Sequence, residues 1–346
     1  MLVATYALSN QLEEHPEQGL KHTISAAAIG IVFMVFATYG ADILRRGWVR
    51  YVGCALLLAD IIAIVTAGDQ KNATAGTLIY VCGLFFVAAC SRSDTSGASL
   101  ALCFVALGVA LSFIYEFRYL TACSAVFLVA FMGAKILRRR WFWLVGVIGS
   151  AGAILTVTWF FLTFDNRGFA WELGQAISSV SGHRANSGRD ELWPYLVYAI
   201  QERPWFGLGA GTLPRDLFST NLSAHSYYLQ VYLQLGALGV GLVICLLLSV
   251  WQLLSKAESS VGKFGAALFL MFVVHNATEV LMLQNNVVLA VAAWSCIGLA
   301  IASDQVAQTS QPNRTVTACL SEAGAERGAV HPPDNRLVGH RESGWS

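Results

Sequence analysis

Leu242-Val243-Ile244-Cys245-Leu246-Leu247-Leu248 is a continuous apolar stretch, and a helix built from it has no polar face. Ile31-Val32-Phe33-Met34-Val35-Phe36 has the same character. A helix on the surface of a soluble protein keeps one polar face, whereas a helix that is apolar all round is buried in a large core or in a bilayer. These two stretches therefore predict helices that are surrounded by apolar groups.

The composition of the whole chain favours the bilayer. Of its 346 residues, 56% are hydrophobic and only 12% are charged, and the mean hydropathy is +0.57. A soluble domain typically carries about 25% charged residues. The net charge of +1 gives no indication of nucleic-acid binding. We therefore predict an all-α protein, a polytopic bundle of transmembrane helices.

Apolar runs of suitable length recur along the chain, because about 20 helical residues cross the roughly 30 Å hydrocarbon layer. Backbone polar groups find no water in lipid, so each run should be a helix. We expect about nine spans, at residues 23–41, 49–67, 75–90, 97–114, 120–136, 142–164, 226–251, 264–282 and 287–303.

The basic residues between these spans are divided unevenly. The short loops on one side hold only Lys71 and Arg118. The other side holds Arg45, Arg46, Arg50, Arg92, Lys135, Arg138, Arg139, Arg140, Lys256 and Lys263. The excess of positive charge places this second side in the cytoplasm.

The chain should then divide into five parts. Residues 1–22 form a polar N-terminal segment, 23–164 hold transmembrane helices 1–6, and 165–224 form a long external loop. Residues 225–303 hold transmembrane helices 7–9, and 304–346 form a cytoplasmic tail. The tail is rich in Pro, Gly, Ser and charge, which predicts disorder.

The external loop has a helical pattern of its own between Arg189 and Gln201. Its apolar residues recur with a helical period: Leu192, Trp193, Leu196, Val197 and Ile200. Ser187 or Gly188 can cap this helix. We predict an amphipathic helix that lies on the outer surface of the bilayer as part of a helical cap, followed by a tight turn over 204–211.

Four motifs in this region follow one another in a fixed order. They are Ser187-Gly188-Arg189-x-x-x-Trp193, Arg203-Pro204-x-x-Gly207-x-Gly209-x-Gly211, Ala224-His225-x-x-Tyr228-Leu229 and Leu235-Gly236-x-Leu238-Gly239. Together they resemble the O-antigen ligase and Wzy-type polysaccharide polymerase superfamily. The first is similar to Thr-Gly-Arg-Thr-Glu-Leu-Trp of the branch that makes exopolysaccharide. The resemblance covers about residues 20–303, and its specific part is 187–239.

Two features depart from the family pattern. Ser226 stands where the family usually has Asn after the histidine. The run Lys71-Asn72-Ala73-Thr74-Ala75 resembles a Ser-Lys/Arg-Thr-Ala element that usually follows more than the two spans expected here. Either the start of the protein is missing, or the chain is an N-terminally shortened relative.

The resemblance implies a glycosyltransferase of the bacterial inner membrane that acts on the periplasmic face. Such an enzyme takes a glycan from an undecaprenyl-diphosphate carrier and passes it to a hydroxyl of another glycan or of lipid A-core. The expected partners are thus the lipid-linked oligosaccharide, the acceptor and membrane lipid, with no nucleic acid. Polymerase and ligase activities both fit. No cofactor or metal is expected, and the external loop has no Asp-x-Asp.

Three residues are the catalytic candidates. The guanidinium of Arg189 can bind the diphosphate bidentately. His225 begins a span at the outer boundary and can accept a proton from the attacking hydroxyl. Glu279 lies near the outer end of the next span, where an ionisable residue indicates function. Because antiparallel neighbours place these ends together, the three should line one outward-facing cleft. The substrate-binding candidates are Arg184, Arg203, Lys71 and Tyr228.

Other interpretations remain open for the same residues. Arg189 could pair with an outer-loop acid such as Asp190 or bind lipid headgroups. His225 could be an interfacial histidine, and Glu279 could be a structural partner of Lys71 or of an arginine. The alternative function is a transporter or flippase of a lipid-linked glycan or other anion. Transporters usually have internal repeats and broken helices at the midplane, whereas this polar cluster lies on one outer face, which favours an enzyme.

Overall fold

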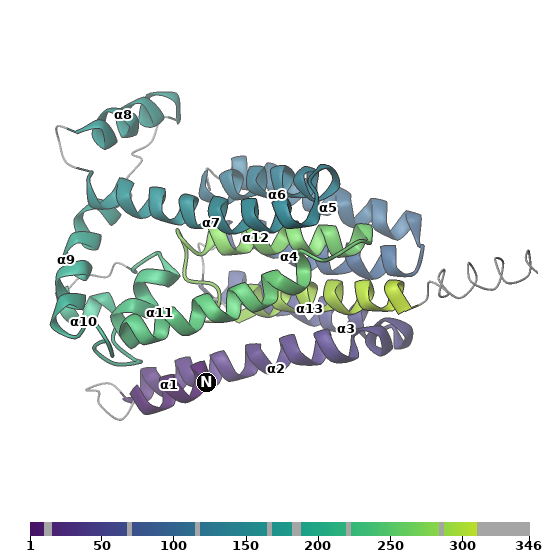
Figure 1. The fold of residues 1–346 in the computed structure, drawn as a ribbon, viewed down its shortest axis with the longest axis horizontal. Helices are drawn as coiled ribbons and strands as arrows, with labels where there is room; N and C mark the ends of the chain where they lie inside the picture. Colours follow the sequence, from purple (N-terminus) through teal and green to yellow (C-terminus); the bar gives the residue numbers. More distant parts are fainter. Residues whose placement is uncertain are drawn as a thin grey trace, which may run out of the picture. The chain divides into compact units, whose positions relative to one another are not determined.

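The computed structural model describes residues 1–9, 16–67, 71–114, 118–164, 168–181, 188–218, 223–283 and 287–309. These ranges are helical and contain no strand, which confirms the all-α prediction (Figure 1). The helices are α1 (Leu2–Ser9), α2 (Pro16–Arg46), α3 (Trp48–Ala67), α4 (Lys71–Ser91), α5 (Thr95–Ile114), α6 (Arg118–Ile136), α7 (Arg139–Leu162), α8 (Phe169–Ser181), α9 (Arg189–Glu202), α10 (Pro214–Phe218), α11 (Tyr227–Leu254), α12 (Ser260–His275) and α13 (Val287–Thr309).

The helices confirm a polytopic membrane bundle. Six of them, α2, α5, α6, α7, α11 and α13, contain described segments that are long and apolar enough to cross a membrane. Three shorter apolar segments lie in α3, α4 and α12. Every predicted span overlaps one of these nine helices. The span predicted at 264–282 differs, because α12 ends at His275 and the chain then turns.

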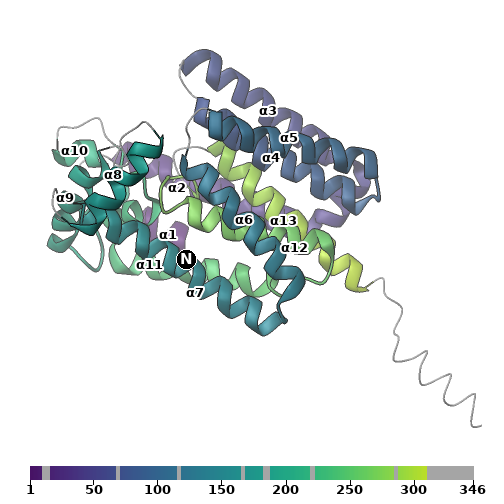
Figure 2. The same cartoon turned by 90° about the horizontal axis from the view of Figure 1, so that it is seen from above.

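The core of the bundle is built around α12 and α13. α12 packs against α4, α6, α7 and α11 (Figure 2). Most of its side chains are buried. α7 instead exposes large apolar side chains such as Ile148 and Leu155. Exposed aliphatic surface of this extent suits contact with lipid. The sequence pattern cannot distinguish a helix buried within the protein from a helix that faces lipid, because both are apolar on all sides.

α9 runs across the ends of α7 and α11 (Figure 1). Trp193 anchors it: the indole is fully buried, stands edge-on to Phe161 at 4.9 Å between ring centroids, and donates a 2.8 Å hydrogen bond to the carbonyl of Ala224. Tyr195 and Tyr198 on the opposite face are exposed. α9 occupies the range in which the sequence predicts an amphipathic helix, and it brings its first residue, Arg189, to the end of the bundle.

α11 is broken at Gly236, and the turn that follows α9 enters the break. Gly236 has φ 63° and ψ −162°, outside the helical region. Ala237 and Leu238 donate backbone hydrogen bonds to Pro204 and Trp205, at 2.8 and 3.3 Å. The carbonyls of Leu233 and Gln234 accept from Leu208 and Gly209, at 2.8 and 3.1 Å. The turn therefore supplies partners for backbone groups that the break leaves without helical ones.

This contact requires glycine on both sides. A Cβ on Gly207 would lie 2.4 Å from the carbonyl carbon of Gln234, and a Cβ on Gly236 would lie 2.4 Å from that of Trp205. Both obstacles are backbone atoms, so a rotamer change cannot relieve them. The second and fourth sequence motifs are thus the two halves of one backbone contact.

We expect Gly236→Ala to destabilise the protein strongly. The backbone of Gly236 lies in a region open essentially to glycine alone, and the strain costs about 1–3 kcal/mol before the clash is added. Gly241→Ala is the matched control, because it lies in the same helix and its Cβ would meet nothing within 4 Å. Thermal unfolding in detergent should show a lower Tm for Gly236→Ala alone; equal Tm values would contradict the role given to the break.

Candidate active site

Arg189 is a buried arginine at the first position of α9. Its side chain is 4% exposed, and the guanidinium carbon lies 4.4 Å from the ring centroid of Tyr119 and 5.6 Å from that of Phe161. Nη2 donates a 3.0 Å hydrogen bond to the carbonyl of Thr278. Nε and Nη1 have no hydrogen-bond partner among the described residues. Arg189 is therefore held in place by aromatic rings and one backbone contact, and it keeps N–H groups for a further acceptor.

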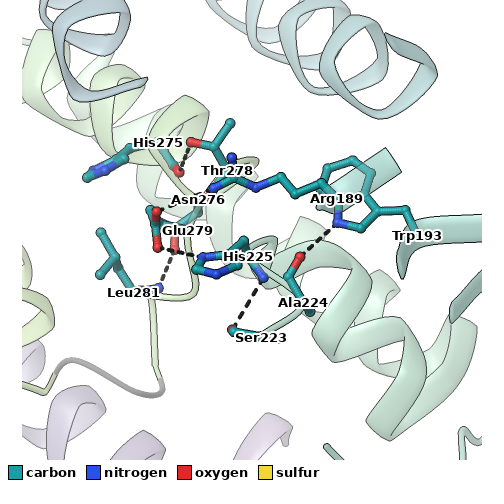
Figure 3. Close-up of polar contacts among 10 residues, drawn as sticks. All are labelled: Arg189, Trp193, Ser223, Ala224, His225, His275, Asn276, Thr278, Glu279 and Leu281. Carbon is teal, nitrogen blue, oxygen red and sulfur yellow. Dashed lines mark hydrogen bonds and ion pairs between the residues drawn. The ribbon is translucent and has the colours of Figure 1, made fainter. Parts of the chain in front are cut away.

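Glu279 joins the other two catalytic candidates (Figure 3). Its Oε1 lies 3.6 Å from Nη2 of Arg189, and its Oε2 lies 3.5 Å from Nδ1 of His225. The side chain of Glu279 is 22% exposed and that of His225 is 39% exposed. One carboxylate therefore lies between a buried cation and a histidine that solvent can reach. The structure brings together the three residues that the sequence selects.

His225 adopts an unusual backbone conformation, with φ 45°. Left-handed geometry is uncommon outside glycine and is tolerated best by Asn, Asp and His. The next residue, Ser226, is the N-cap of α11, and its hydroxyl accepts from the N–H of Leu229 at 3.5 Å. Serine and asparagine are equally good caps, so Ser226 can start α11 as well as an asparagine at this position would.

The turn after α12 fixes Glu279, and Asn276 organises it. The side chain of Asn276 is fully buried, and its Oδ1 accepts from the N–H groups of Leu281 and Met282 at 3.1 and 2.8 Å. The N–H of Tyr227 reaches the carbonyls of Asn276 and Glu279, at 2.9 and 3.1 Å. These bonds tie the turn to the start of α11, beside His225, and explain why the helix stops at His275.

Sequence reasoning missed these supporting residues. Asn276 is a polar residue inside an apolar run, and this feature of the sequence could have indicated its structural role. Tyr119 and Phe161 gave none, because aromatic residues near span ends are common in membrane proteins. Tyr119 lies on α6 and Phe161 on α7, and only the three-dimensional structure shows that both surround Arg189 at the start of α9.

The four substrate-binding candidates are placed differently. Arg203 is exposed directly after α9, and Tyr228 donates a 2.8 Å hydrogen bond to the carbonyl of Val273. Neither side chain forms a hydrogen bond or ion pair with the three catalytic candidates in the described part of the chain. Lys71 begins α4, but its side chain lies outside the described residues, as does all of Arg184. Within the described ranges, no three His, Cys, Asp or Glu side chains are grouped to hold a metal ion.

The fold and the site define a multi-pass membrane protein with a charged cluster where α9, α11 and α12 meet. Residues 119–244 match the family model described as O-Antigen ligase. This stretch contains Arg189 and His225, and Glu279 lies beyond it. The match confirms the similarity to the O-antigen ligase and Wzy-type superfamily, and it supports a ligase-type function in the membrane. A search of curated proteins gave no match.

Proposed function

We propose that the protein is a glycosyltransferase of the bacterial inner membrane. It moves a glycan from an undecaprenyl-diphosphate carrier to a hydroxyl of another glycan or of lipid A-core, on the periplasmic face. The observation that carries the proposal is the carboxylate of Glu279 between the Arg189 guanidinium and the His225 imidazole. This cluster joins a group that can bind phosphate to a group that can accept a proton.

Arg189 is assigned to the diphosphate. Negative charge grows on the leaving diphosphate as its bond to the sugar breaks, and a fixed cation with free N–H groups stabilises that charge. Nε and Nη1 of Arg189 are buried and have no partner in the described residues, so they are the donors available for this purpose. Tyr119 and Phe161 hold the guanidinium plane in one orientation, which reduces the reorganisation needed on binding.

His225 is assigned to the acceptor. With a proton on Nδ1 facing Glu279, the imidazole presents Nε2 as a base. Nε2 takes the proton of the acceptor hydroxyl as its oxygen forms the bond to the anomeric carbon of the donor sugar. The bond from that carbon to the diphosphate breaks, and the diphosphate leaves with the electron pair. Glu279 orients His225 and balances the charge that the imidazole gains.

The four remaining candidates are assigned to the rest of the substrate. Arg184, Arg203 and Lys71 supply positive charge for the carrier diphosphate or for an acidic glycan, and Tyr228 lies one residue beyond the start of α11. Polymerase and ligase activities would share the same bond-forming step and differ in the acceptor.

The position of the cluster favours an enzyme over a transporter. Arg189 begins α9, His225 precedes α11 and Glu279 follows α12, so the charges lie at helix ends. A transporter places its substrate near the midplane, often at a broken helix. The break in α11 is occupied by the backbone of the turn after α9.

The test is reconstitution of the purified full chain with an undecaprenyl-diphosphate-linked repeat unit. A second lipid-linked unit is the acceptor in one reaction, and lipid A-core is the acceptor in another. We expect a longer glycan or a ligated lipid A-core product, together with released undecaprenyl diphosphate. Movement of the lipid-linked unit across vesicles without a new glycosidic bond would support the transporter instead.

A further inference from the structure

A second group of charged side chains surrounds a cavity of about 230 Å³ between the α6–α7 and α11–α12 connections. Four basic residues line it: Lys135, Arg139, Lys256 and Lys263. Glu258 is the one carboxylate among the described lining residues. Apolar side chains, including Phe142 and Leu254, complete the wall. The cavity thus combines an excess of positive charge with an apolar surface.

The four cations are available to a ligand. In the described part of the chain, none of them forms an ion pair with a carboxylate. Lys135 lies with Nζ 4.2 Å from the ring centroid of Phe131. Arg139 is the first residue of α7, whose N-cap residue, Arg138, makes no side-chain capping bond. The N–H groups of the first turn of α7 therefore add to the positive field.

The α11–α12 connection, which contains Lys256 and leads to Lys263 on α12, is held in place. Oδ1 of Asp304, on α13, accepts from the backbone N–H groups of Glu258 and Ser259, at 3.2 and 2.9 Å. Asp304 is 7% exposed, so these bonds are shielded from water. Lys256 lies in this connection and Lys263 in the first turn of α12, so Asp304 holds the backbone between the two cations.

The cavity lies at the opposite ends of the helices that carry the candidate active site. α11 starts beside His225 and ends at Leu254, and α12 starts at Ser260 and ends shortly before Glu279. α7 has 24 residues and spans about 36 Å, enough to cross the hydrocarbon layer. The distribution of basic residues predicts that this end faces the cytoplasm.

We propose that this cavity binds the phosphate of an anionic phospholipid headgroup from the leaflet opposite the active site. Basic pockets between transmembrane helices on the cytoplasmic side are suited to such headgroups. The four cations attract the negatively charged phosphodiester, and the apolar wall can contact the glycerol and the upper part of the acyl chains. A soluble phosphate ester offers the same charge without the acyl chains, so the two sources can be distinguished.

The experiment measures lipid binding to the full chain in detergent by native mass spectrometry. The protein is titrated with phosphatidylglycerol, with phosphatidylcholine, and with phosphatidylglycerol in competition with sn-glycerol 3-phosphate. The pocket variant is Lys256→Gln/Lys263→Gln. The matched control is Arg45→Gln/Arg46→Gln, which removes two charges from the same predicted face outside the cavity.

We expect phosphatidylglycerol to bind at least tenfold more tightly than phosphatidylcholine. The pocket variant should lose this preference, and the control should change it less than twofold. Equal binding of the two lipids, or equal losses in both variants, would overturn the proposal. Competition by sn-glycerol 3-phosphate at lipid-like concentrations would overturn the lipid assignment and make a soluble phosphate ester the ligand.

Discussion

Arg189→Ala should reduce product formation by at least about 10²–10³-fold, the range seen when one donor to a developing oxyanion is removed. The substitution deletes the N–H groups that we assign to the diphosphate and leaves the carboxylate of Glu279 without its buried cation. Arg189→Lys should also be poor, because a point charge does not reproduce the planar fork of a guanidinium between two aromatic rings.

The measurement is the initial rate of undecaprenyl diphosphate release by purified variants with equal helical content. Arg215→Ala is the matched control: Arg215 lies on α10, its side chain is 54% exposed, and it is not part of the cluster. The control should keep its rate. Activity of Arg189→Ala within twofold of the unmodified protein would remove Arg189 from the site.

His225→Asn should lower the rate by about 10²–10⁴-fold, as expected for loss of a general base. Asparagine tolerates the left-handed backbone at this position. The variant therefore removes the imidazole base without adding backbone strain. His225→Ala should lose as much activity and some stability. A rate for His225→Asn close to that of the unmodified protein would exclude proton transfer at this residue.

The link between His225 and Glu279 can be tested by combining substitutions. Glu279→Gln keeps the size of the side chain and removes its charge, so the imidazole loses its orienting partner. If the two residues act as one unit, the double variant should be little slower than His225→Asn alone. Fully additive losses would show that Glu279 acts independently of His225.

The fold followed from apolar runs, because backbone groups in lipid leave helices as the only local choice for such runs. The apolar runs could not show that a side chain ends a helix within a run, as Asn276 does for α12. They also could not show that Gly207 and Gly236 meet, since a glycine marks a position where a Cβ does not fit but does not show which distant segment approaches it.

The three candidate site residues could be selected from the sequence, whereas the residues that surround them could not. Arg189 and His225 belong to motifs, and alternating spans put Glu279 at the same end of the bundle. Their environment depends on packing between distant helices. Phe161 on α7 reaches the guanidinium because Trp193 fixes α9 across the end of that helix, and Tyr119 reaches it from α6.

The contact of Arg189 with Thr278 joins residues 89 positions apart, and this separation has a consequence during biosynthesis. A growing chain exposes its N-terminal segments first. α9 and its glycine turn are therefore made before α11 offers the gap at Gly236, and both are made before Glu279. Until the turn after α12 has been translated, Arg189 has no carboxylate partner at Glu279. The nascent protein thus carries Arg189, which we assign to the diphosphate, without its carboxylate partner, and we expect competence for transfer only after the last spans have been made.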